Sequence, residues 1–487
     1  MKIKINRIIP FTRLIPFSLL LLTFAGCKKN MTDLNVNPKA PTHVQGEMLF
    51  SNGEKALTDL ITTPNVNYGN FELFAQYWAE TTYPQESQYI LNQRDNALNW
   101  WNGLYRDVIE DFNQGIILMR QQAADPTLLN VEKAAYVNKI AIAKILRAYA
   151  FSILVNTFGD IPYTEALQGR ANTSPKYDNQ KDVYYAVLDT IDASITELNP
   201  DAESFGSADL IYNGDVGEWI KLANSIKLKL GMVLADVDPA KAKAEVEAAA
   251  PYVFTSNSDN ALLPYTTSPP NVNPVWSNLV QSNRNDFVAA NTIIDTMNAH
   301  KDPRRPYYFS DVSGKYIGGI YGSGNAFKNF SHPSDKVEAA DFPGIIMDYA
   351  EVELLLAEGA ARGMNVGGTA EQHYDNGVAA SIQWWTDGAN DGTAYLAMPI
   401  NQFDASNWKK SIGVQSWINY YTRGFDAWLS IRRLDYPKIV APPSAVSAFP
   451  VRVTYPPTEE NLNPNYSAAA ASIGGDEVTT KLFWDKF

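Results

Sequence analysis

Apolar residues recur at the three- and four-residue spacing of amphipathic helices through much of the chain. The spacing predicts a helix over 95–120 and a stronger one over 131–157. From Ile140 onward the second helix has only Lys144 and Arg147 as charged residues, so we expect it to be buried on all sides within the protein. Further helices are predicted over 180–199, 216–235, 239–250, 346–363, 371–386, 407–422 and 424–435.

Several of these helices follow one another across short turns, as in tetratricopeptide-type units. The stretch 251–345 breaks this pattern with nine prolines and a glycine cluster, and only 286–300 looks helical within it. A long irregular insertion rich in Tyr, Phe and Trp is expected to be ordered and functional. The predicted fold is therefore mostly α, with tetratricopeptide-like helix pairs and a large irregular, loop-rich insertion.

The N-terminus has the pattern of an export signal. Four basic residues precede an apolar run over 14–25, which is too short to span a membrane and is followed by Cys27. The Phe24-Ala25-Gly26-Cys27 sequence resembles a bacterial lipobox, in which the cysteine is lipidated. We predict a lipoprotein signal peptide over 1–26, a lipid anchor and tether over 27–46, and a single domain over 47–487.

The charge balance argues against nucleic acid as a partner. Removal of residues 1–26 takes four of the 40 Lys and Arg and none of the 53 Asp and Glu, which leaves a net charge of −17. Nucleic-acid binding requires Lys and Arg to neutralise phosphates. The same excess of acid argues against electrostatic docking to anionic lipid, so membrane attachment is expected through the anchor alone.

The sequence shows no motif typical of an enzyme. The four histidines are scattered without zinc-ligand spacing, no nucleophile elbow is present, and the glycines near Gly318 fit no phosphate-binding loop. Glycosidases need two facing carboxylates, and Glu351, Glu353 and Glu358 are the most suggestive cluster. We interpret that cluster as a solvated helix face, and we expect no metal, no cofactor and no catalytic residue.

Aromatic residues make 12% of the chain and gather in polar stretches. Rings beside amide and hydroxyl groups suit a sugar, whose C–H face stacks on the ring, and suit a peptide nearly as well. Core packing of an amphipathic helix is the alternative, above all for Phe71, Phe74 and Trp78. The candidate ligand-binding residues are Tyr68, Tyr77, Trp78, Tyr83, Tyr89, Trp276 and Arg284.

Five stretches in this order resemble the SusD/RagB family of Bacteroidetes outer-membrane lipoproteins, in its SusD-like-2 branch. They are Asp33 to Pro38; Tyr77 to Tyr83 with Trp101 to Asp107; Arg284 to Phe287 with Asp302 to Arg304; Tyr349 to Ala361; and Gly424 to Trp428 with Arg432 and Arg433. The resemblance implies a helical fold with a loop-rich face and no shared catalytic residues. It implies a lipid-anchored protein at the cell surface that passes a glycan or oligopeptide to a SusC-like TonB-dependent transporter.

Two other functions remain open from the sequence. A surface glycoside hydrolase would need two facing carboxylates across a cleft. A helical-repeat scaffold would bind no small ligand at all. The aromatic-rich insertion favours binding over the scaffold, and the lack of a catalytic motif favours binding over hydrolysis.

Overall fold

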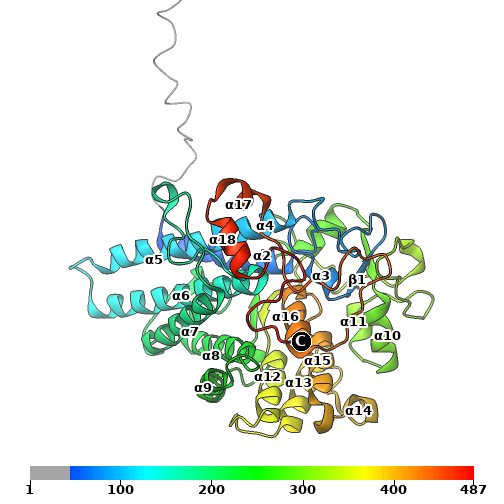
Figure 1. Cartoon of the computed structure of the whole chain (residues 1–487). Coiled ribbons are helices and arrows are strands. Elements are labelled where there is room, and N and C mark those ends of the chain that lie inside the picture. The colour runs from blue at the N-terminus through cyan, green and yellow to red at the C-terminus, as the bar shows by residue number, and fades with distance from the viewer. Residues whose placement is uncertain (1–43) are drawn as a thin grey trace, which may run out of the picture. The chain divides into compact units, whose positions relative to one another are not determined.

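The computed structural model describes residues 44–487, so the predicted signal peptide, Cys27 and nearly all of the tether lie outside the described residues. The fold from Gln45 onward is built mainly of helices (Figure 1). The helices are α2 (Gly46–Thr62), α3 (Phe71–Phe74), α4 (Asn96–Asn102), α5 (Glu110–Ala123), α6 (Asn130–Phe158), α7 (Gln180–Glu197), α8 (Val216–Val233), α9 (Pro239–Ala249), α10 (Asn291–Ala299), α11 (Arg305–Tyr308), α12 (Tyr349–Ala361), α13 (Ala370–Trp385), α14 (Thr393–Leu396), α15 (Trp408–Asn419), α16 (Gly424–Leu434), α17 (Pro457–Leu462) and α18 (Tyr466–Ser472).

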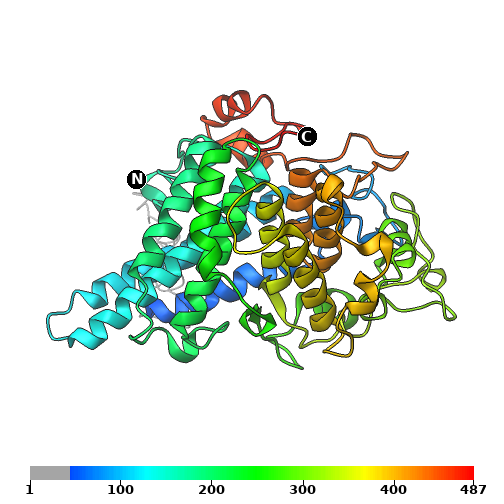
Figure 2. The same cartoon turned by 90° about the horizontal axis from the view of Figure 1, so that it is seen from below.

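Consecutive helices pack side by side from α5 to α9, and α12 packs on α13 while α15 packs on α16. Figure 2 shows the first group beside the second, with the loop-rich segments beyond the second group. The helix starts are set by capping side chains: Asp215 and Asp348 accept hydrogen bonds from backbone N–H groups in the first turns of α8 and α12. The predicted helix pairs and the mostly α fold are thus confirmed.

The apolar helix α6 lies in the core, as its sequence predicts. Among the described residues, it is the one helix long and apolar enough to cross a membrane, yet 83% of its most apolar stretch is buried inside the fold. Its Lys144 and Arg147 reach the edge of the core, where they contact Glu197 and Asn113. Apolar contacts on every face of residues 141–158 explain why this part of the helix lacks a polar side.

Four short strands form two antiparallel pairs in the loop-rich part. Strand β1 (Trp78–Glu80) pairs with β3 (Phe287–Ala289), and β2 (Ala261–Leu263) pairs with β4 (Gly344–Met347). The predicted helix over 286–300 is wrong in its first residues, because Phe287, Val288 and Ala289 form a fully buried strand and α10 begins only at Asn291. A short apolar run buried on both faces has no period that separates strand from helix.

Candidate functional site

A cleft of about 380 Å³ opens where α2 meets the start of the irregular insertion. We call it the Tyr68 cleft, because the half-exposed ring of Tyr68 is the aromatic side chain in its wall. Its other lining residues are Lys55, Ala56, Asp59, Leu60, Thr63, Asn65, Gly103, Asp107, Pro270, Val272, Pro274, Ser277 and Asn278. Its size suits a small ligand such as one or two sugar rings.

Two π-helices face each other across this cleft. One, η3 (Gly103–Ile109), interrupts the helix that runs from α4 into α5, and the other, η8 (Trp276–Gln281), lies in the insertion. Single π-turns are frequent at functional sites because they widen a helix locally and redirect its side chains. Gly103 lets η3 pack closely on α2, since a Cβ atom at this position would lie only 3.1 Å from the methyl carbons of Leu60.

The charged groups of the Tyr68 cleft are already paired. Lys55 binds Asp59, which also accepts a 2.7 Å hydrogen bond from the Tyr265 hydroxyl. Burial, together with the nearby Asp59 carboxylate, raises the pKa of Tyr265 well above its ordinary value, so this hydroxyl stays protonated and donates. Asp107 pairs with Arg106 at 2.6 Å. The cleft therefore offers neutral polar groups and one ring rather than a free charge.

Tyr83 and Arg284 lie at one end of the β1–β3 pair. The pair continues past Glu80 and Phe287, because the Thr81 N–H donates to the Asp286 carbonyl and the Thr81 hydroxyl donates to the Asn285 carbonyl. Tyr83 is 71% exposed and the Arg284 side chain is 65% exposed. Two candidates that are 201 positions apart in the sequence thus come together, and we call them the Tyr83–Arg284 rim.

The segment from Trp276 to Arg284 connects the Tyr68 cleft to the Tyr83–Arg284 rim. Half-buried Trp276 begins η8, Ser277 and Asn278 of this helix line the cleft, and the Arg284 N–H donates to the Leu279 carbonyl at the end of η8. Two segments were predicted from the sequence to bind a ligand, one from Tyr68 to Tyr89 and one around Trp276 and Arg284. The structure therefore places exposed residues of both segments on one part of the surface. Ligand contact by these residues stays a prediction.

Three of the candidates are buried. Tyr77, Trp78 and Tyr89 are at most 3% exposed, and a ligand on the surface of this structure does not reach their rings. Trp78 donates its indole N–H to the Tyr421 hydroxyl at 3.0 Å, and Tyr77 donates to the Trp417 carbonyl. These rings pack beneath the loop that carries Tyr83. In the segment from Tyr68 to Tyr89, only the exposed side chains, such as Tyr68 and Tyr83, are therefore available to a ligand.

The sequence reasoning missed most of the cleft wall. Helix α2, which supplies Lys55 and Asp59, was not predicted, although Phe50, Leu57 and Leu60 follow helical spacing and are buried. Asn278 and Asp107 have no local signal, because their role depends on how η8 and η3 meet in space. Asn278 donates to the Pro274 carbonyl at 2.8 Å, which fixes the orientation of its amide.

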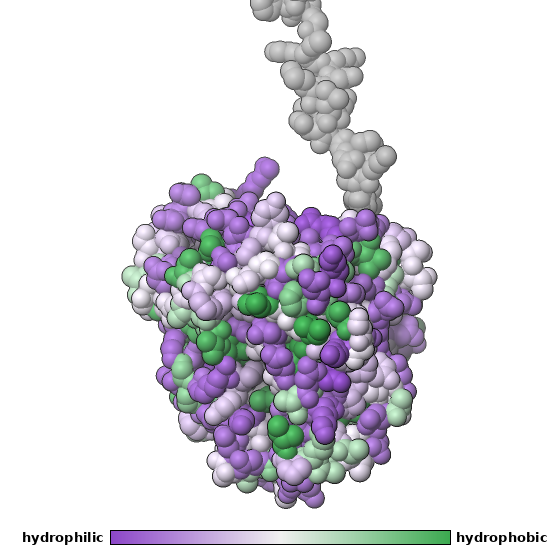
Figure 3. Space-filling model, turned by 90° about the vertical axis from the view of Figure 1, so that its right-hand side faces the viewer, coloured by the Kyte–Doolittle hydropathy of each residue, from purple (hydrophilic) through white to green (hydrophobic). Residues whose placement is uncertain are grey.

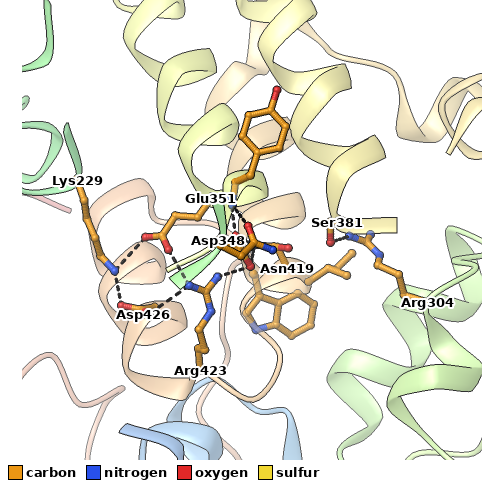
Figure 4. A network of polar contacts seen from close by, with 12 residues as sticks. Lys229, Arg304, Asp348, Glu351, Ser381, Asn419, Arg423 and Asp426 are labelled. Carbon is orange, nitrogen blue, oxygen red and sulfur yellow. Dashed lines mark hydrogen bonds and ion pairs between the residues drawn. The ribbon is translucent and has the colours of Figure 1, made fainter. Parts of the chain in front are cut away.

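The carboxylates of α12 form buried ion pairs, so the interpretation as a solvated helix face is wrong. Glu351 and Glu358 are fully buried, and Glu353 is nearly so. Figure 4 shows Glu351 between Lys229 and Arg423, at 2.9 and 2.7 Å. Burial raises the pKa of Glu351, but the two cations outweigh burial and hold it below its ordinary value. These groups tie helices together and do not line a cleft.

Metal-binding clusters are not found within residues 44–487: no group of three or more His, Cys, Asp or Glu side chains there is placed to hold an ion. The three histidines within the described residues each have a hydrogen-bond partner, and that of His332 Nδ1 is the Pro333 carbonyl at 3.1 Å. His373 Nδ1 lies 2.7 Å from Glu353, and His300 Nδ1 lies 2.6 Å from the Asn401 amide oxygen.

Comparison with known proteins agrees with this architecture. The SusD-like 2 family model, described as starch-binding associating with outer membrane, matches residues 38–456. No match is found among curated proteins. Among solved structures, a chitin-binding protein is 26% identical with a TM-score of 0.76, and the alignment covers 91% of this chain and 100% of that one.

Two further solved structures are similar over nearly their whole length. A chitin-binding SusD homologue from Flavobacterium johnsoniae is 24% identical, with a TM-score of 0.76 and coverage of 90% of this chain and 98% of that one. A SusD homologue from Bacteroides uniformis is 26% identical, with a TM-score of 0.74 and coverage of 90% and 100%.

Proposed function

The chain belongs to the SusD-like family, and from this premise we propose that it is a surface lipoprotein that binds a nutrient glycan and does not cleave it. In this proposal the lipid on Cys27 holds the protein on the outer membrane. The bound glycan passes to a SusC-like TonB-dependent transporter. Family members associate with the outer membrane, which supports this location.

The observation that carries the proposal is the chemistry of the Tyr68 cleft. A half-exposed ring stands beside the hydroxyl of Ser277 and the amides of Asn65 and Asn278, while Lys55 and Asp59 neutralise each other. Sugars have an apolar C–H face that stacks on a ring and hydroxyls that need amide and hydroxyl partners. A free charge would favour an ionic ligand, and the charges of this cleft are paired.

Chitin oligosaccharides are the first glycans to test, because two of the similar solved structures are chitin-binding proteins. Starch oligosaccharides follow, since starch binding describes the family. An oligopeptide remains the alternative ligand, and it would use the same ring and amides while it adds backbone hydrogen bonds.

The surface around the Tyr83–Arg284 rim suits a reversible contact with the proposed transporter. The insertion exposes Val280, Ile317 and Ile320, and Val440 and Val446 are exposed as well. Figure 3 shows that apolar side chains on the loop-rich side stand in separate spots among polar ones. Permanent interfaces are larger and more apolar, whereas mixed surfaces are typical of partners that separate. A transporter that must open to accept a ligand needs the second kind of surface.

Calorimetric titration of the purified full-length protein with both glycan series tests binding. We expect Tyr68→Ala to weaken binding about two- to tenfold, the effect of losing one aromatic contact. Tyr252→Ala is the matched control, since Tyr252 is an exposed tyrosine that does not line the cleft. Equal affinities of the two variants would contradict the assignment of the cleft, and consumption of the glycan during titration would favour the hydrolase.

Chemical cross-linking of intact cells, followed by affinity purification from detergent-solubilised outer membrane, tests the partner, because the cross-links hold together proteins that otherwise separate. A barrel protein recovered in stoichiometric amount supports delivery to a transporter. Recovery of the chain alone under mild conditions would contradict that part of the proposal while the binding result stands.

A further inference from the structure

A second pocket, of about 420 Å³, lies at the C-terminal end of α13. We call it the Trp384 pocket. Leu262 of β2, the Phe342–Pro343 segment and the Gln383 and Asp387 side chains surround it together with Trp384. It shares no lining residue with the Tyr68 cleft.

The ring of Trp384 is held in place by its neighbours. It stands nearly perpendicular to Trp385, with ring centres 5.0 Å apart, and at 72° to Phe342, with ring centres 5.9 Å apart. Such edge-to-face contacts fix a ring without covering it completely, and Trp384 remains half-buried. A ring whose orientation is fixed before binding loses little entropy when a ligand stacks on it.

The polar groups of the pocket suit a neutral ligand. Lys336 and Asp387 are the two charged residues that line it, and they pair at 2.7 Å. Lys336 also donates to the Trp385 carbonyl at 2.9 Å, so its ammonium is held in place. Because each charged group already has a partner, neither is available to bind an ionic ligand.

An amide in the wall lacks one of its hydrogen-bond partners. Asn257 donates its Nδ2 group to the Ala380 carbonyl at 3.0 Å, but its Oδ1 atom is enclosed and has no partner among the described residues. Because this oxygen is closed off from molecules even as small as water, a ligand hydroxyl does not reach it, and the accessible amide of the pocket is that of Gln383. The Gln383 side chain is exposed beside Trp384 and adds a second amide.

The walls of the two sites are joined by hydrogen bonds. Asn273 lies in the segment that supplies Val272 and Pro274 to the Tyr68 cleft. Its N–H donates to the Ala340 carbonyl at 2.7 Å, and its Nδ2 group donates to the Phe342 carbonyl at 2.8 Å. Phe342 lines the Trp384 pocket, so these hydrogen bonds link the backbone beside one site to a wall of the other.

We propose that the Trp384 pocket is a second binding subsite for neutral sugar residues, built from a fixed indole, the exposed Gln383 amide and a neutralised charge pair. This inference rests on the proposed glycan-binding function and deepens it. A glycan long enough to engage both sites gains affinity because the second contact is intramolecular.

The test compares short oligosaccharides of about two rings with long ones of about six rings, because only the long ones have rings left for a second site once the first is filled. The probes are chitin and starch oligosaccharides, titrated calorimetrically into the full-length protein. We expect Trp384→Ala to weaken binding of the long probes about two- to tenfold and to reduce the gain from length. Gln383→Ala changes an exposed side chain and should act in the same direction with less effect on folding.

Trp408→Ala is the matched control, because Trp408 is also half-buried but lines neither site. Thermal melting of each variant separates loss of fold from loss of contact. If Tyr68→Ala weakens binding while Trp384→Ala and Gln383→Ala leave every probe length unchanged, the subsite is overturned and the proposed function stands. If the unmodified protein binds no glycan, both proposals fail.

Discussion

Arg423 Nη1 lies 2.7 Å from Glu351 Oε2, and both side chains are buried. This ion pair joins the start of α16 to the first turn of α12 (Figure 4). Arg423 also binds Asp348 at 2.9 Å, and Lys229 on α8 binds Glu351 and Asp426. The ion pairs thereby hold α8, α12 and α16, which lie far apart in the sequence, in one arrangement.

Removal of Arg423 should destabilise the protein strongly. In Arg423→Met the carboxylates of Asp348, Glu351 and Asp426 keep only Lys229 as a nearby cation, and a buried charge without its partner costs about 3–5 kcal/mol. Urea denaturation followed by circular dichroism measures the loss. Lys438→Met is the control, because the Lys438–Asp435 pair is largely exposed and should change stability by less than about 1 kcal/mol. Similar losses in both variants would show that the network contributes no more than a surface pair.

The Glu72 carboxyl should make the protein less stable as pH rises. Burial raises the pKa of Glu72 to about 8, against a weaker opposing effect of the Gly424 N–H that donates to it. A carboxyl with a raised folded-state pKa binds more protons when folded, so stability is highest at low pH and falls between about pH 4.5 and pH 8.

Glu72→Gln imitates the protonated carboxyl and removes this dependence. We expect it to be more stable than the unmodified protein by on the order of 3 kcal/mol near pH 8, and by less than about 1 kcal/mol near pH 5. Denaturation midpoints at both pH values measure the difference. A constant difference across this range would mean that Glu72 keeps an ordinary pKa in the folded state.

The helices that were predicted correctly depend on local information in the sequence. The spacing of apolar residues in α8 and α12, and the Asp215 and Asp348 caps before them, are visible in a short window. The strand at Phe287 was missed because its pairing with Trp78–Glu80 is a long-range event. A buried strand of three residues has too few positions to display a period.

The site was only partly predictable for a similar reason. The aromatic residues between Tyr68 and Tyr89 look alike in sequence, but the backbone there is mostly irregular: α3 spans four residues, and Gln76, Tyr83 and Tyr89 have positive φ values. Each left-handed residue redirects the chain, so neither a helical nor a strand period tells which rings face solvent. The Glu351 carboxylate was misread because its cationic partners, Lys229 on α8 and Arg423 just before α16, lie far from it in the sequence.

Substitutions at Trp78 and Tyr83 should have opposite consequences. Trp78→Ala removes a buried ring that packs against Phe287 and hydrogen-bonds Tyr421, so we expect a loss of about 3–5 kcal/mol of stability. Tyr83→Ala removes an exposed ring and should change stability by less than about 0.5 kcal/mol while it weakens glycan binding. Denaturation and titration of the two variants separate the effects, and a Tyr83 variant with unchanged affinity would remove the rim from the binding surface.

The anchor is tested by replacing Cys27, the single cysteine of the chain. A lipidated cysteine carries acyl chains whose burial contributes about 0.8 kcal/mol per methylene, enough with two or more chains to hold a domain on a membrane. Cys27→Ser cannot be acylated on sulfur, and we expect this variant in the soluble fraction after cell lysis, whereas Lys28→Ser should stay with the membrane. The net charge of −17 without residues 1–26 provides no electrostatic attraction to anionic lipid that would replace the acyl chains. Membrane retention of Cys27→Ser would therefore point to a protein partner as the anchor, and protease treatment of intact cells shows which side of the membrane the domain occupies.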